Sequence, residues 1–151
     1  MEIRKLDVHE NPPMDLLLTA DPSRMKVKEY LDRGDCYVMV CRNEIIGVYM
    51  LLATGPETIE LVNVAVSENK QGKGIGKQLI LHAIQKSTEV GFNKIEIGTG
   101  NSSIGQLALY QKCGFRITGV EANYFVNHYE EKIFENGIWC RDRVQLSLEL
   151  K

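Results

Sequence analysis

The sequence predicts a mixed α/β domain in which helices pack on a mostly antiparallel sheet. Three apolar segments between residues 36 and 66 are separated only by short polar turns, which predicts an antiparallel meander of strands. Two later segments, residues 76–90 and 103–112, carry apolar residues at helical spacing. Residues 144–150 alternate strictly between apolar and polar side chains, as in a strand with one buried face. This mixture of strands and helices is typical of a sheet covered by helices.

These patterns place each expected element along the chain. Strands are expected at residues 2–6, 36–41, 45–53, 58–66, 94–99, 116–120 and 144–150, and helices at 14–20, 22–33, 76–90 and 103–112. The sheet would thus have about seven strands, flanked by about four helices. Asp21 is expected to cap the second helix, with Pro22 at its first position. Residues 121–142 are aromatic and irregular, and no regular element is predicted there.

Length and composition restrict the class of protein. The chain has 151 residues, of which 44% are hydrophobic and 25% charged, so we expect one domain over residues 1–151 with its own core. The net charge of −2 gives no reason to expect a nucleic-acid partner. No apolar run approaches the roughly 20 residues of a membrane span, and residues 1–5 lack the apolar core of a signal peptide. We therefore expect no membrane partner and a cytoplasmic location.

The four cysteines form no metal-binding pattern. Cys36, Cys41, Cys113 and Cys140 include no C-x-x-C pair, and no histidine cluster accompanies them. We expect reduced thiols that pack as small apolar side chains, and no metal.

A glycine-rich turn at residues 71–77 is the most informative segment. It follows the expected strand 58–66 and leads directly into the expected helix 76–90. The first backbone N–H groups of a helix have no partner within it, and the helix dipole adds positive charge there. Glycines remove the Cβ atoms that would keep a bulky anion from the backbone. The turn is therefore predicted to hold a phosphate, with Lys70, Lys73 and Lys77 adding charge nearby.

Other interpretations of the turn fit less well. A P-loop needs G-x-x-x-x-G-K-[ST], but the spacing from Gly72 to Gly76 is one residue short, and Gln78 stands where Ser or Thr would bind magnesium. A Rossmann fingerprint needs G-x-G-x-x-G in a parallel unit, whereas the spacing here is G-x-G-x-G after a meander. A turn that only changes chain direction would not require three glycines, which cost backbone entropy.

Two motifs resemble the GNAT superfamily of N-acetyltransferases. The segment Gln71-Gly72-Lys73-Gly74-Ile75-Gly76 is similar to the family signature Q/R-x-x-G-x-G/A, and residues 64–66 resemble its cofactor-binding strand. Downstream, Leu109-Tyr110-Gln111-Lys112-Cys113-Gly114-Phe115 looks like the family's L-Y-x-K-x-G-F element. The resemblance implies the GNAT fold, with acetyl-coenzyme A as cofactor in the gap between a splayed pair of strands.

The resemblance also implies which residues contact the cofactor. The backbone of Val64, Ala65 and Val66 would bind the pantetheine arm and orient the thioester. The pyrophosphate would be held by the backbone N–H groups of Gln71, Gly72, Lys73, Gly74, Ile75, Gly76 and Lys77. The family often has an asparagine seven residues before the tyrosine; here Ser103 stands at that position and Asn101 lies two residues earlier, so either could bond the pantetheine amide. Ser103, or Ser102 beside it, could instead cap the helix.

The implied reaction is direct transfer of the acetyl group to an amine. Tyr110 matches the family tyrosine near the coenzyme sulfur, and its phenol could protonate the leaving thiolate, although it could also simply pack on the helix. Glu60 is a candidate base on the strand, on the same face as Val62, Val64 and Val66 by alternation, or an ordinary carboxylate at a strand start. A backbone N–H such as that of Val64 would polarise the carbonyl.

Residues 123–131 are the candidate acceptor loop. Tyr124 and Phe125, with nearby carboxylates, could hold a cationic amine, and His128 is a second candidate base, because histidine is the residue type that changes charge near neutral pH. Asn63, predicted on the face opposite to that of Glu60, could also line the acceptor site. The same aromatic residues could instead form a patch buried against the sheet or a second subunit, and His128 could be a solvated loop histidine.

The acceptor class stays open between a primary amine of a small molecule and one of a peptide. A catalytically silent module that binds acyl-coenzyme A as a sensor or scaffold is the alternative function. A homodimer through the C-terminal strands is compatible with the sequence, which contains no direct sign of it.

Overall fold

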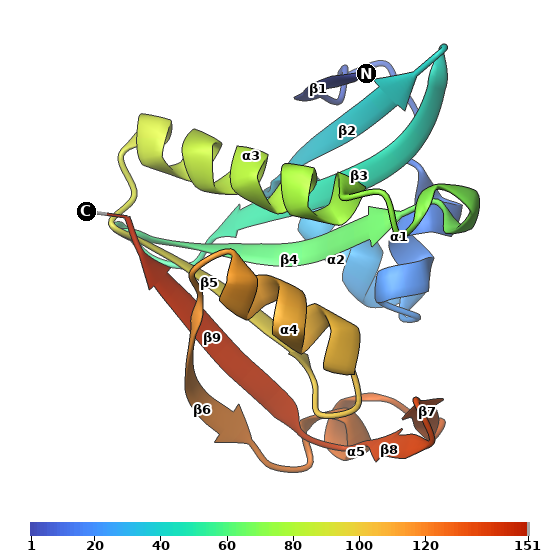
Figure 1. Ribbon diagram of the computed structural model, residues 1–151, viewed down its shortest axis with the longest axis vertical. Helices are drawn as coiled ribbons and strands as arrows, with labels where there is room; N and C mark the ends of the chain where they lie inside the picture. Colours follow the sequence, from blue (N-terminus) through green and yellow to red (C-terminus); the bar gives the residue numbers. More distant parts are fainter. Residues whose placement is uncertain (151) are drawn as a thin grey trace.

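The computed structural model describes residues 1–150, which fold around a seven-stranded sheet of order β1-β2-β3-β4-β5-β9-β6 (Figure 1). Its strands are β1 (Glu2–Lys5), β2 (Asp35–Cys41), β3 (Glu44–Ala53), β4 (Thr58–Val66), β5 (Lys94–Gly100), β6 (Arg116–Glu121) and β9 (Arg143–Glu149). Only the pairing of β4 with β5 is parallel, and every other pair in this sheet is antiparallel. The predicted mixed, mostly antiparallel sheet is confirmed.

Helices cover both faces of this sheet. The helices are α1 (Met14–Ala20), α2 (Arg24–Arg33), α3 (Ile75–Val90), α4 (Ile104–Lys112) and α5 (Tyr124–His128). Figure 1 shows α3 and α4 on one face and α1 and α2 on the other. Leu79 and Ile80 of α3 are fully buried in the core of the first face, and Leu17 of α1 and Val27 of α2 in that of the second.

The sheet separates into two halves between β4 and β5. These strands pair only over Thr58–Glu60 and Lys94–Glu96, where both begin. Beyond Glu60, β4 continues to Val66 paired with β3 alone, and β5 continues to Gly100 paired with β9. The peptide groups of β4 beyond Glu60 that point towards β5 therefore have no strand partner, and the two strands form a fork.

A bulge in β4 changes which side chains share a face. Met50 of β3 pairs with Asn63, but its neighbour Leu51 pairs with Leu61, so Val62 is an extra residue in β4. Leu61 and Val64 consequently both face α3 and α4, and Glu60 and Asn63 both lie on the face of α1 and α2. The predicted placement of Glu60 with Val64 and Val66, opposite to Asn63, is wrong, because strict alternation does not allow for a bulge.

Most element boundaries agree with the sequence to within one or two residues. The turn between β2 and β3 is made by Arg42 and Asn43, both with positive φ, which suits a tight hairpin. Helix α2 starts later than predicted: Ser23, rather than Asp21, caps it, with its side chain accepting a hydrogen bond from the Lys26 N–H. Residues 121–142 were predicted to be irregular, but they contain α5 and a small separate hairpin, β7 (Ile133–Glu135) with β8 (Ile138–Cys140).

Candidate functional site

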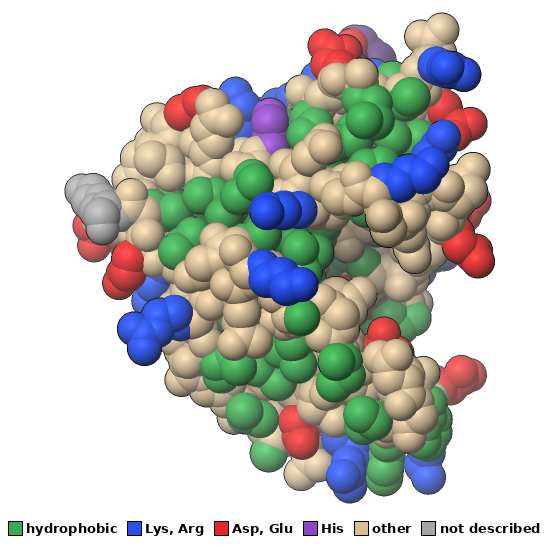
Figure 2. Space-filling model, in the orientation of Figure 1, with side chains coloured by type: hydrophobic (Ala, Val, Ile, Leu, Met, Phe, Trp, Pro, Cys, Tyr) green, Lys and Arg blue, Asp and Glu red, His purple; other side chains and the backbone are tan. Residues whose placement is uncertain are grey.

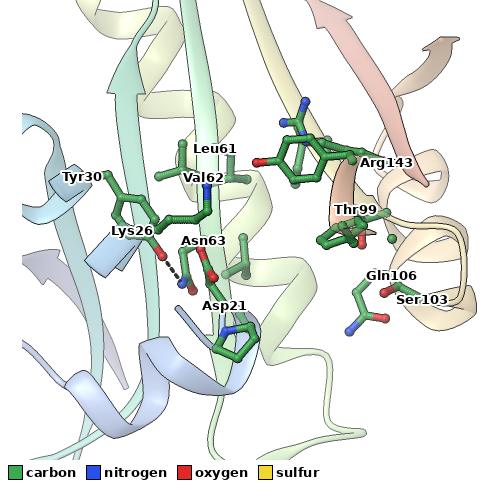
Figure 3. A pocket seen from close by; sticks show the side chains of 18 of the residues that line it. Asp21, Lys26, Tyr30, Leu61, Val62, Asn63, Thr99, Ser103, Gln106 and Arg143 are labelled. Atoms are coloured by element: carbon green, nitrogen blue, oxygen red, sulfur yellow. Dashed lines mark hydrogen bonds between the residues drawn. The ribbon is translucent and has the colours of Figure 1, made fainter. Parts of the chain in front are cut away.

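A cavity of about 550 Å³ opens where β4 and β5 separate (Figure 3). Residues from β4, β5, α1, α2, α4 and the α5–β9 region line it. Glu60 and Asn63 reach it from the α1–α2 face of the sheet, and Val64 and Tyr110 from the opposite face. The cavity thus extends through the sheet, and two ligands could meet in it from opposite faces.

The glycine turn lies at the end of β4 and has the geometry of an anion cradle. Gly72 and Gly74 have φ of 78° and 80°, a left-handed conformation that favours glycine, and a Cβ on either would contact no other group. Gly74 caps α3, whose first-turn N–H groups have no helical partner. Within residues 1–150, no carbonyl accepts a hydrogen bond from the N–H of Gly72, Lys73 or Gly74. These donors are free to bind an anion.

The side chains of the turn leave its backbone exposed. Gln71 turns away from the loop and donates a hydrogen bond from Nε2 to the carbonyl of Val66, 3.1 Å away, which fixes the exit of β4. Ile75 is buried in the core and anchors the start of α3. Figure 2, which views this face, shows Lys and Arg side chains beside the hollow between the upper half, with α3, and the lower half, with α4.

An ion pair crosses the closed end of the fork. Nη2 of Arg143, on β9, lies 2.9 Å from Oε2 of Glu60, on β4. The guanidinium reaches Glu60 by passing over Gly98 of β5, because it occupies the space that a Cβ of residue 98 would need. Burial raises the pKa of the Glu60 carboxyl, and the neighbouring Arg143 cation opposes that rise.

Tyr110 brings a hydroxyl to the cavity from α4. Its side chain is 7% exposed and packs against Phe115, with 6.3 Å between ring centroids. Burial raises the pKa of the phenol further above its ordinary value, so the group is protonated at neutral pH. No acceptor for its hydroxyl is present among residues 1–150, which leaves the proton available to a ligand.

Aromatic residues of α5 and its C-terminal flank form one wall of the cavity. Tyr124, Phe125 and Tyr129 line it, and the hydroxyl of Tyr129 donates a hydrogen bond to Oδ1 of Asp21, 2.8 Å away. His128 was also predicted to contact the acceptor, but its side chain is exposed and does not line the cavity. Its Nδ1 lies 2.7 Å from the carbonyl oxygen of Tyr124. His128 lies one helical turn after Tyr124 and stacks on its ring, with 4.3 Å between ring centroids, an arrangement that a loop prediction could not anticipate.

Asn63 is held by the helices on its face. Its Nδ2 donates to the carbonyl of Leu17 at 3.0 Å and to the hydroxyl of Tyr30 at 2.7 Å. Because a carbonyl only accepts, these bonds fix the orientation of the amide, and Oδ1 is left without a partner among the described residues. Asn63 therefore lines the cavity as predicted, but its amide protons are occupied within the protein.

The two candidates for the pantetheine amide behave differently. Asn101 binds the chain before β9: Nδ2 donates one hydrogen bond to the carbonyl of Trp139, and Oδ1 accepts from the N–H groups of Arg141 and Asp142 at 2.8 and 2.9 Å. Asn101 does not line the cavity, so its predicted ligand contact is not supported. Ser103 does line it, at the start of α4, but its hydroxyl donates to Glu135 Oε1 at 2.8 Å and does not cap the helix.

Sequence reasoning missed several residues of the cavity. Arg143 opens the last strand on its polar face, so its position was visible in the sequence, but nothing there linked it to Glu60. Lys26 and Asp21 come from the start of α2 and the turn before it, and only the packing of that helix on β4 brings them to the cavity.

Comparison with known proteins identifies the family. A model described as "Acetyltransferase (GNAT) family" matches residues 3–115. The chain belongs to the GNAT acetyltransferase family. The predicted GNAT N-acetyltransferase is therefore confirmed at the level of the family and the fold.

Similar proteins cover the GNAT chain almost completely. An "Uncharacterized N-acetyltransferase YvbK" of Bacillus subtilis is 60% identical over 136 residues, which are 90% of this chain and 88% of that protein. A GNAT family acetyltransferase from Elizabethkingia anophelis with acetyl-CoA bound is 47% identical with a TM-score of 0.96, over 98% of this chain and 97% of the other. An acetyltransferase from Bacillus subtilis in complex with CoA is 55% identical with a TM-score of 0.95, over 99% of each chain. The coenzyme in these two structures agrees with the predicted cofactor.

In the part of this GNAT chain that the structure describes, no helix is long and apolar enough to cross a membrane. The same residues contain no group of three or more His, Cys, Asp or Glu side chains arranged to hold a metal ion.

Proposed function

We propose that this protein, as one domain over residues 1–151, transfers the acetyl group of acetyl-coenzyme A directly to a primary amine of a small molecule or peptide. The observation that carries the proposal is the fork between β4 and β5, whose cavity passes through the sheet. A cofactor bound from the α3–α4 face and an acceptor bound from the α1–α2 face would meet in it.

The residues present fit the cofactor. The unpaired peptide groups of β4 around Val64 to Val66 would bind the amide groups of a pantetheine arm, as an edge strand binds an extended chain. The free N–H groups from Gly72 to Lys77 would hold the pyrophosphate at the start of α3. When bound, acetyl-coenzyme A supplies a thioester carbonyl and a thiolate leaving group.

Residues of the chain provide the proton transfers that the reaction needs. Glu60, on the acceptor face, would take a proton from the acceptor ammonium, directly or through water, and leave a neutral amine able to attack. Its raised pKa brings it closer to the working pH of a base. The Val64 N–H would polarise the carbonyl oxygen. The Tyr110 hydroxyl would donate a proton to the departing sulfur, and no covalent bond to the enzyme is required.

A panel assay tests this proposal. Full-length protein would be incubated with acetyl-coenzyme A and amino acids, aromatic amines, polyamines and peptides, with coenzyme release and product mass measured together. Equal amounts of coenzyme A and N-acetylated product are expected, with no acetyl adduct in the intact mass of the protein. Binding of the coenzyme without product from any amine would instead favour the silent sensor or scaffold.

A further inference from the structure

The carboxylates of the cavity are already paired within the protein. Each one that lines the cavity contacts a donor or a cation, the pairs being Asp21 with the Tyr129 hydroxyl (2.8 Å), Glu29 with Arg33 (3.5 Å), Glu60 with Arg143 (2.9 Å) and Glu135 with the Ser103 hydroxyl (2.8 Å). Glu29 and Glu60 are paired with a cation, whereas Asp21 and Glu135 are bonded only to neutral donors.

Lys26 is the exception among the cations of the cavity. Arg33 and Arg143 each have a carboxylate partner, but within residues 1–150 no carboxylate oxygen lies within 4.0 Å of the Lys26 ammonium. Its Nζ lies 5.9 Å from the ring centroid of Tyr124 and 5.6 Å from that of Tyr129. The Ser23 side chain accepts a hydrogen bond from the Lys26 N–H and so fixes the backbone of Lys26 in the first turn of α2.

A second cation approaches the same aromatic wall from the other side of the fork. The guanidinium carbon of Arg143 lies 5.5 Å from the ring centroid of Tyr124. Figure 3 shows Lys26 and Arg143 entering the cavity from opposite walls, one from the β4 side and one from the β5 side. A ligand group beside Tyr124 therefore lies near two cations, of which Arg143 is paired with Glu60 and Lys26 has no carboxylate partner among the described residues.

We propose that the amine acceptor also carries a carboxylate, and that Lys26 binds this carboxylate while the rings of Tyr124, Phe125 and Tyr129 contact an apolar or aromatic body. This inference rests on the proposed acetyl transfer and deepens it. A half-buried lysine without a carboxylate partner favours an anion, and charge-assisted hydrogen bonds are stronger than neutral ones. The acceptor class is thus that of an aromatic amino acid or a similar amino-carboxylate.

Matched acceptor pairs that differ only in the carboxylate test the proposal. Suitable pairs are phenylalanine with phenethylamine, and 4-(aminomethyl)benzoate with benzylamine. We expect kcat/KM to be at least about tenfold higher for a carboxylate-bearing member. A wild-type enzyme that acetylates the members without a carboxylate equally well or better would overturn the proposal.

Substitutions at Lys26 identify the group responsible. Lys26→Met should raise KM about tenfold for the carboxylate-bearing acceptor, with kcat little changed, and should not raise KM for the counterpart without a carboxylate. Lys26→Arg should retain most of the preference. Lys28→Met is the matched control, because Lys28 is exposed on the same helix and does not line the cavity. An equal loss for both members of a pair would contradict the assigned role.

A binding measurement separates this inference from the proposed reaction. Calorimetry on the protein with coenzyme A would compare N-acetylphenylalanine with N-acetylphenethylamine, and no turnover is needed. Tighter binding of the carboxylate compound that is lost in Lys26→Met supports the inference even if no amine is acetylated. Equal binding of the two compounds would overturn it, whatever the outcome of the activity assay.

Discussion

Arg143 connects the two halves of the sheet through Glu60, with 2.9 Å between Nη2 and Oε2. The two residues lie on β9 and β4, and β5 runs between these strands. Glu60 is also the last residue of β4 that pairs with β5. The ion pair therefore closes the narrow end of the fork and places a carboxylate at the edge of the cavity. A half-buried pair of this kind influences the protonation of Glu60 as well as its position.

The pH dependence of turnover should report on this pair. Burial raises the pKa of Glu60, so a base role predicts that kcat/KM falls as pH is lowered through that pKa. Glu60→Gln should remove this acid limb and lower kcat by at least about 100-fold. Arg143→Met should move the limb to higher pH, because the cation that favours the ionised form is lost. Arg141→Met, outside the cavity, should leave the pH profile unchanged.

Tyr110 can be tested without disturbing its packing. Tyr110→Phe retains the ring that contacts Phe115 and removes only the hydroxyl. We expect kcat to fall about tenfold to 100-fold, with the dissociation constant for coenzyme A and the melting temperature nearly unchanged. Stopped-flow release of coenzyme A and calorimetry provide the two readouts. Wild-type kcat in Tyr110→Phe would exclude the hydroxyl from the chemistry.

The anion cradle should be sensitive to charge at Gly74. Gly74→Asp and Gly74→Asn share the cost of a side chain at positive φ, about 1 kcal/mol, and both side chains would extend into open space. Only Asp adds negative charge beside the free N–H groups. We expect the dissociation constant for coenzyme A to be at least about tenfold higher in the Gly74→Asp variant than in the Gly74→Asn variant. Similar affinities in the two variants would argue against a pyrophosphate at this turn.

Gly98 is required by the path of Arg143. Gly98→Ala would place a methyl group where the guanidinium lies. Because the guanidinium is the end of a flexible side chain, we expect it to move away from Glu60, with less than about 1 kcal/mol of destabilisation and an acid limb displaced as in Arg143→Met. Gly105→Ala is the control, since a Cβ there contacts no other group and the residue lies in α4. It should stabilise the protein by about 0.5 kcal/mol. Chemical denaturation measures the change in stability of both variants. A Gly98→Ala variant with the wild-type pH profile would show that Arg143 can reach Glu60 by another path.

Local patterns were sufficient for most of the architecture. The boundaries of β4 follow from residues 58–66 alone, and α1 and α3 were placed to within one residue, because apolar spacing and glycine stops determine them. The glycine turn was recognised because its function depends on backbone N–H groups, which the residue types expose directly. The helical arrangement of residues 124–128 was not foreseen, since their apolar spacing is too short to distinguish a helix from a loop.

Relationships between strands could not be obtained in the same way. The extra residue Val62 depends on pairing with β3, so the faces of Glu60 and Asn63 were assigned wrongly from alternation. Likewise, Asn101 was a reasonable ligand contact by composition, but its amide is used by the backbone of residues 139–142, about 40 positions away. The charged residues of the cavity come from four separate segments, and only the folded chain shows which of these charges have no partner.

The short contact between β4 and β5 also has a consequence for the lifetime of the protein. Because only three residue pairs join these strands, a coenzyme bound in the fork would supply main-chain contacts that the sheet itself lacks. A ligand that binds only the folded state at 100 times its dissociation constant adds about 2.7 kcal/mol to the free energy of unfolding. Resistance to proteolysis in the cell should then rise and fall with the supply of acetyl-coenzyme A, so that starvation would shorten the half-life of the enzyme.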